Sequence, residues 1–170
     1  MPAGKFFAIA VVLLFANISF GQEAPAQKYK IKQAEPGTGS NIRRDVITSS
    51  MPLDKTYREL SDVHKAMLRA QYEAMPPEDE PPFPLEGLGK LYDTLGKVSD
   101  KLQNWGDIAV VVTVDSNGEG VSAKVLKADD AIIGRHAAQV AMLTRYKPAL
   151  CAGKPCTMDF VIRLKVTRGL

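Results

Sequence analysis

The chain has 170 residues, with 22 Lys and Arg against 19 Asp and Glu and a formal net charge of +3. This near-neutral balance, without a block of five or more basic residues, argues against a nucleic-acid partner or an anionic membrane surface. The length predicts one domain, or one domain with an appendage.

Residues 1–21 have the layout of a secretory signal peptide. Lys5 precedes a run of 15 almost wholly apolar residues, 6–20, and small residues follow up to Gly21. A membrane-spanning helix needs about 20 apolar residues, so we expect cleavage after Gly21 and a periplasmic location. If the segment stays uncleaved, it is an N-terminal anchor in the inner membrane and the protein touches the membrane only there.

The next part of the chain predicts a linker followed by helices. Residues 22–53 contain no periodic apolar pattern and predict a flexible linker. Within the helical region 54–104, apolar residues recur every three or four positions over 55–75 and again over 85–104, which predicts one or two amphipathic helices. Between them, the proline-rich stretch 75–84 predicts a rigid, extended connector.

Residues 105–170 change to a pattern of strands around one helix. β-branched residues at 108–114, a turn signal at 115–118 and alternation at 121–125 predict a hairpin. A helix over about 131–145 follows, and clean alternation from Met158 to Val166 predicts the last strand. We therefore expect an α+β fold in β-β-α-β order, a small three-stranded antiparallel sheet with one packed helix.

The only two cysteines, Cys151 and Cys156, flank a tight reversal before the last strand. In an exported chain such a pair is more often a disulfide than a redox or metal site. Residues across a tight reversal also lie within reach of a disulfide. We expect a covalent bond across the turn, with free thiols and metal or redox use as the alternatives.

The segments 110–130 and 145–166, together with the Pro-aromatic-Pro stretch at 81–87, resemble the C-terminal domain of TonB-type energy transducers. The resemblance rests on a strand that ends in Val-Asp-x-x-Gly, an aromatic-x-Pro-Ala element and a Gly-x-Pro turn before the last strand. The residues that carry it are Asp115, Gly118, Tyr146, Pro148, Ala149, Gly153 and Pro155.

The resemblance implies a role in transport at the outer membrane. In that family the edge of the last strand pairs with a short periplasmic segment of an outer-membrane receptor, and an open sheet edge can accept an extended peptide in this way. The residues that this implies for partner binding are Phe160, Ile162, Arg163, Leu164, Lys165 and Val166.

Nothing in the pattern predicts catalysis, a metal or a cofactor. His64 and His136 are the only histidines, and no nucleophile motif accompanies them. The acidic run Glu78-Asp79-Glu80 reads as a solvated loop rather than as a ligand set. The alternative function is a small secreted structural or inhibitory domain, whose sheet edge is covered by the helix predicted at 55–75.

Overall fold

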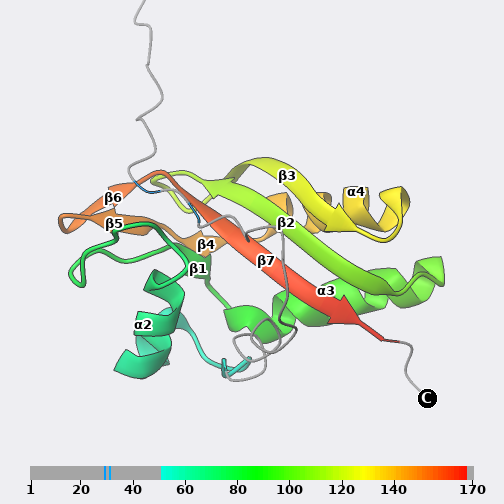
Figure 1. The fold of residues 1–170 in the computed structure, drawn as a ribbon, viewed down its shortest axis with the longest axis horizontal. Coiled ribbons are helices and arrows are strands. Elements are labelled where there is room, and N and C mark those ends of the chain that lie inside the picture. Colours follow the sequence, from blue (N-terminus) through cyan, green and yellow to red (C-terminus); the bar gives the residue numbers. More distant parts are fainter. Residues whose placement is uncertain (1–28, 30, 32–50, 168–170) are drawn as a thin grey trace, which may run out of the picture.

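The computed structural model describes Tyr29, Ile31 and residues 51–167, and Figure 1 shows their arrangement. The predicted signal segment 1–21 and most of the predicted linker 22–53 lie outside these residues. No helix within the described part of the chain has the length and apolar character needed to cross a membrane.

A three-stranded antiparallel sheet lies at the centre of the fold, and the fold class is α+β as predicted. Its strands are β2 (Gly106–Val114), β3 (Gly120–Ala128) and β7 (Met158–Val166), in the spatial order β3-β2-β7. Between β3 and β7 in the chain runs helix α4 (Ala131–Leu143), which begins where the Asp130 carboxylate accepts hydrogen bonds from the amides of Ile132 and Ile133. The expected antiparallel sheet with a packed helix is therefore present.

One face of the sheet packs against two helices. Helix α4 lies over β2 and β3, while α3 (Gly87–Leu102) lies beside α4 and contacts β7 (Figure 1). Burial along β2 alternates residue by residue, as the pleat of a strand requires. The buried side chains between sheet and helices are Ile108, Val110, Val112, Val114, Phe160, Ile162, Ile133, Ala137, Ala141, Leu88, Leu91 and Leu95.

The helix predicted over 55–75 is wrong in extent. A short 3-10 turn, η1 (Tyr57–Glu59), is followed by α2 (Asp62–Arg69), and Leu60 between them is extended, with ψ 141°. The turn closes because Glu59 bonds back to the amide of Thr56, and Ser61 then caps a new helix. Local side-chain capping thus divides the apolar stripe, whereas the second predicted helix is confirmed as α3.

The proline-rich connector is part of the core rather than a spacer. Strand β1 (Phe83–Pro84) pairs with β4 (Tyr146–Lys147), and Glu80 forms an isolated bridge with Leu150. Pro81, Pro82 and Phe83 are fully buried. The Phe83 ring lies 6.0 Å from that of Tyr57 and 6.2 Å from that of Phe160, so the connector joins the helical segment to the sheet.

The disulfide predicted from the sequence is present in a second hairpin. Strands β5 (Ala149–Cys151) and β6 (Lys154–Cys156) pair around a two-residue turn in which Ala152 and Gly153 both have positive φ. The Sγ atoms of Cys151 and Cys156 are 2.00 Å apart. This hairpin packs on Tyr29, Tyr72 and Met158 in a small second cluster, with Ile31 beside it.

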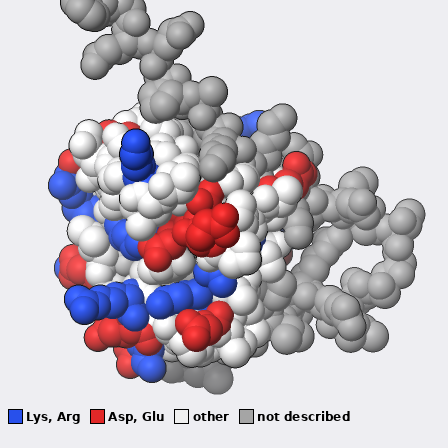
Figure 2. All heavy atoms as spheres, turned by 90° about the vertical axis from the view of Figure 1, so that its left-hand side faces the viewer, with Lys and Arg blue, Asp and Glu red and all other residues white. Residues whose placement is uncertain are grey.

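The described surface carries charges of both signs. Figure 2 shows a face on which acidic side chains lie between lysine and arginine side chains. Lys147 and Glu80 form an ion pair, 2.9 Å apart, which connects β4 to the proline-rich segment.

Candidate functional site

The two outer strands of the central sheet present different edges. Strand β3 is interrupted twice, because Leu126 and Val121 have no partner in the register with β2, and such bulges discourage pairing with another strand. Strand β7 keeps unbroken register with β2 over nine pairs, from Gly106 with Val166 to Val114 with Met158. The regular edge of the sheet is therefore that of β7.

The hydrogen bonds of the β2–β3 hairpin show which backbone N–H and C=O groups of β7 point away from the sheet. The Asp115 amide donates to the carbonyl of Glu119, so odd-numbered residues of β2 bond toward β3 and even-numbered ones toward β7. The matching residues of β7 are Met158, Phe160, Ile162, Leu164 and Val166. The N–H and C=O groups that point away from the sheet thus belong to Asp159, Val161, Arg163 and Lys165.

The chain itself occupies two of these outward carbonyls. The hydroxyl of Tyr72, which follows α2, donates to the carbonyl of Asp159 at 2.7 Å. The hydroxyl of Tyr92, on α3, donates to the carbonyl of Arg163 at 3.4 Å. The expectation of an open edge is therefore wrong for these two positions. Within the described part of the chain, no hydrogen bond engages the outward groups of Val161 or Lys165.

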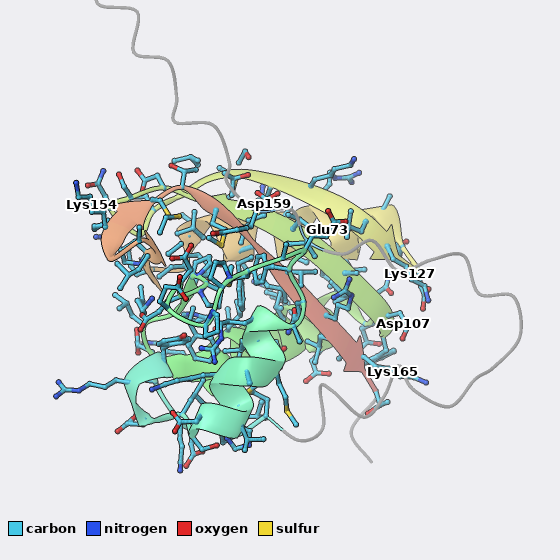
Figure 3. All side chains as sticks on the ribbon, turned by 60° about the vertical axis from the view of Figure 1, so that its left-hand side comes forward. Glu73, Asp107, Lys127, Lys154, Asp159 and Lys165 are labelled. Carbon is cyan, nitrogen blue, oxygen red and sulfur yellow. A yellow bond between two sulfur atoms is a disulfide. The ribbon has the colours of Figure 1, made fainter. Side chains whose placement is uncertain are left out.

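Side chains on the face of the sheet opposite the helices give this edge a charge gradient. At the start of β7, the Asp159 carboxylate accepts a hydrogen bond from Thr113 Oγ1 at 2.7 Å. Arg163 and Lys165 follow toward its end, where Figure 3 places Lys165 near Asp107 and Lys127. The hydrogen bond from Lys127 lowers the pKa of Asp107, and the charge of Lys165 lowers it further. The start of β7 is thus acidic and its end basic.

The six residues predicted for partner binding divide between the two faces of β7. Phe160 and Ile162 are buried against the helices, and Leu164 and Val166 pack partly against the same core. Arg163 is half-buried, and this burial lowers the pKa of its guanidinium, while Lys165 is exposed. Arg163 and Lys165 therefore have side chains that a bound peptide could contact, whereas the side chains of the other four residues pack against the core.

Four of the predicted motif residues meet at one point. The Asp115 carboxylate accepts hydrogen bonds from the amides of Asn117 and Glu119, which closes the β2–β3 turn. Gly118 accepts a hydrogen bond from the Tyr146 amide at 2.9 Å, and its φ is 82°. A Cβ at this glycine would lie 2.1 Å from the Tyr146 carbonyl oxygen and 3.6 Å from Pro148 Cδ. The Val-Asp-x-x-Gly turn and the aromatic-x-Pro-Ala element thus pack directly against each other.

The remaining motif residues lie in or beside the disulfide hairpin. Ala149 is fully buried, and Pro155 stands opposite Leu150 in the β5–β6 pair. The hairpin turn is held by Asp79, whose carboxylate accepts hydrogen bonds from the Ala152 amide at 2.7 Å and from the Tyr29 hydroxyl at 2.5 Å.

Asp79 is only 1 % exposed, so its expected place in a solvated loop is wrong. Tyr72 lies within the stretch 55–75, whose apolar spacing predicted a helix. Neither role has a local signal, because the partners lie 73 and 87 residues further along the chain.

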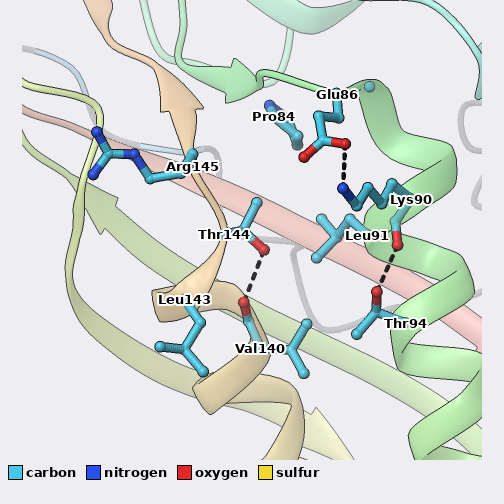
Figure 4. A pocket seen from close by; sticks show the side chains of 10 residues that line it. Pro84, Glu86, Lys90, Leu91, Thr94, Val140, Leu143, Thr144 and Arg145 are labelled. Carbon is cyan, nitrogen blue, oxygen red and sulfur yellow. Dashed lines mark hydrogen bonds and ion pairs between the residues drawn. The ribbon is translucent and has the colours of Figure 1, made fainter.

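A separate groove of about 320 Å³ lies between the start of α3 and the end of α4, and Figure 4 shows its lining. Leu91 and Val140 form its apolar wall, and an ion pair joins Lys90 to Glu86 at its rim. Leu143 beside it is 83 % exposed. Among the described residues, no three His, Cys, Asp or Glu side chains are placed to hold a metal ion.

No model of a known protein family matches this chain, and no curated protein matches it.

Proposed function

We propose that the protein binds an extended peptide, which adds to the outer edge of β7 as a further strand of the sheet. The observation that carries the proposal is the unbroken nine-pair register of β7 at the margin of the sheet, against the two bulges of β3. Main-chain hydrogen bonds supply the affinity in this mode of recognition, and alternate side chains supply the specificity. The TonB resemblance favours a periplasmic segment of an outer-membrane receptor as the bound peptide.

The charge gradient along β7 defines the guest further. In an antiparallel guest, acidic residues opposite Lys165 and Arg163 gain from cross-strand charge pairing, and a neutral residue suits the position opposite Asp159. Alternate positions, opposite the even-numbered residues of β7, are best filled by β-branched residues. A synthetic probe that fits this pattern is Glu-Val-Glu-Val-Thr-Val-Thr-Val.

A matched pair of proline variants tests the proposal by isothermal titration calorimetry with this probe. Val161→Pro removes an outward N–H of β7, and Ala123→Pro removes the equivalent outward N–H of β3, so both leave the bonds to β2 in place. We expect Val161→Pro to weaken binding at least about tenfold and Ala123→Pro to leave it unchanged. Thermal unfolding of both variants checks that they remain folded.

The second candidate is a structural or inhibitory domain that captures no strand. The hydrogen bonds from Tyr72 and Tyr92 to the β7 edge favour it, since they engage acceptors that a guest would need. If the protein captures no strand, the wild type binds neither the glutamate probe nor a probe in which lysine replaces both glutamates. Binding of the glutamate probe that is lost when its alternate residues are N-methylated supports strand addition instead.

A further inference from the structure

Of the two hydrogen bonds that described residues make to outward carbonyls of β7, the shorter comes from the Tyr72 side chain. Its hydroxyl donates to the Asp159 carbonyl at 2.7 Å, and the residue is only 3 % exposed. The ring packs with Met158 and Ala149, which places it at the start of β7. A strand added along the whole edge would need the Asp159 carbonyl as an acceptor, so guest and Tyr72 compete for it.

The segment that carries Tyr72 is anchored by the Tyr72 ring and by an isolated bridge between Tyr72 and Ile31, whereas its own backbone forms a tight turn. Helix α2 ends at Arg69, and the Tyr72 amide donates back to the Arg69 carbonyl at 3.0 Å. Glu73 and Ala74 are exposed, and Ala74 has a φ of 52°, a conformation that a residue with a Cβ adopts at a cost. Opening of this turn would break the contacts of Tyr72 but none of the backbone pairs of the central sheet, and local opening has a lower free energy than global unfolding.

Tyr92 covers the same edge in a weaker way. It lies on α3, which is held by the main core, and its hydroxyl is 3.4 Å from the Arg163 carbonyl. This distance is longer than the usual range for a hydroxyl donor, whereas the bond from Tyr72 to the Asp159 carbonyl lies within it. The two covers therefore act unequally.

We propose that Tyr72 is a displaceable cover of the β7 edge, so that the protein binds a strand only when the segment around Tyr72 opens. The inference rests on the proposed function. Because opening reduces the apparent affinity by the fraction of molecules that are open, a change that weakens the cover should tighten binding. The cover gives the free protein a closed edge, which protects it against pairing with other chains.

The test compares Tyr72→Phe with Tyr146→Phe, using the peptide Glu-Val-Glu-Val-Thr-Val-Thr-Val in calorimetry. Both tyrosines are buried, and each donates one hydrogen bond of 2.7 Å to a backbone carbonyl, Tyr146 to that of Ala141 within the main core. Loss of the bond at β7 is expected to tighten binding roughly two- to tenfold, and loss of the core bond to leave it within about twofold.

Hydrogen exchange of the wild-type protein supplies a second readout that does not depend on a variant. We expect the amides of residues 70–74 to exchange faster when the probe is bound. Binding by wild type that Tyr72→Phe does not tighten, or slower exchange at 70–74, overturns the cover and leaves strand addition standing. Absence of binding by the wild type and by Tyr72→Phe overturns both the cover and the proposed function.

Discussion

Asp79 holds the disulfide hairpin to the rest of the molecule, and its removal should be one of the costliest single changes. The carboxylate is 1 % exposed and accepts hydrogen bonds from the Ala152 amide and the Tyr29 hydroxyl. Bonds to a charged group are worth about 1.5–3 kcal/mol each. Asp79→Ala leaves both donors without this acceptor, so we expect it to lower the free energy of unfolding by about 3–5 kcal/mol.

The effect can be measured by urea unfolding of the oxidised protein, followed by circular dichroism. Glu78→Ala is the control, since Glu78 is the exposed neighbour in the same acidic run. Asp79→Asn keeps an oxygen for the Ala152 amide and should cost roughly 1 kcal/mol. A loss below about 1 kcal/mol for Asp79→Ala, equal to that for Glu78→Ala, would refute the role of the buried carboxylate.

Three further predictions concern the core and its crosslink. Burial raises the pKa of Tyr92 to about 12, against about 10 in an unfolded chain. The protonated Tyr92 side chain therefore contributes at most about 2.7 kcal/mol to the free energy of unfolding. This contribution is present below pH 10 and is lost as the pH rises through 12. Absorbance titration checks this, and a Tyr92 that ionises near pH 10 in the native protein would contradict it. Reduction of Cys151–Cys156, which closes a six-residue loop, should cost about 2 kcal/mol in urea unfolding while helix content is kept; an unchanged midpoint would count against the crosslink. Gly118→Ala should cost at least about 2 kcal/mol, because its Cβ would overlap the Tyr146 carbonyl, and a neutral effect would mean that the β2–β3 turn does not dock there.

The central sheet could be predicted because its signals are local. The β-branched run at 108–114 and the alternation along 158–166 are typical of strands, and the structure places β2 and β7 there. Helix α4 could be predicted from the capping residue Asp130, and the tight turn from Ala152-Gly153. In each case a few neighbouring residues determine the outcome.

The pairing of the proline-rich segment could not be predicted in the same way. Prolines lack a donor, so the stretch 75–84 reads as a connector. The structure avoids the conflict by using residues beside the prolines: the amides of Glu80 and Leu85 donate to the carbonyls of Leu150 and Arg145, both at 3.0 Å. The partner segment lies about 60 residues away, and no local pattern identifies it.

The alternative function placed the helix predicted at 55–75 over the sheet edge, but it did not identify Tyr72 as the residue that makes the contact. Tyr72 continues the helical spacing of the apolar residues before it, but α2 ends at Arg69, and the turn that follows directs the ring to β7. Helical periodicity gives the spacing of apolar residues over 55–75, but it does not identify the residues that Tyr72 contacts. A pattern of apolar residues does not indicate that the Tyr72 hydroxyl forms a hydrogen bond to β7.

The most direct test of strand addition at β7 is the NMR hydrogen exchange of individual backbone amides, with and without the peptide Glu-Val-Glu-Val-Thr-Val-Thr-Val. Strand addition at β7 should protect the outward amides of Val161, Arg163 and Lys165 when the peptide binds, and should leave the amides of β3 unchanged. Protection that appears along β3, or a bound peptide that leaves the β7 amides as they were, would contradict it.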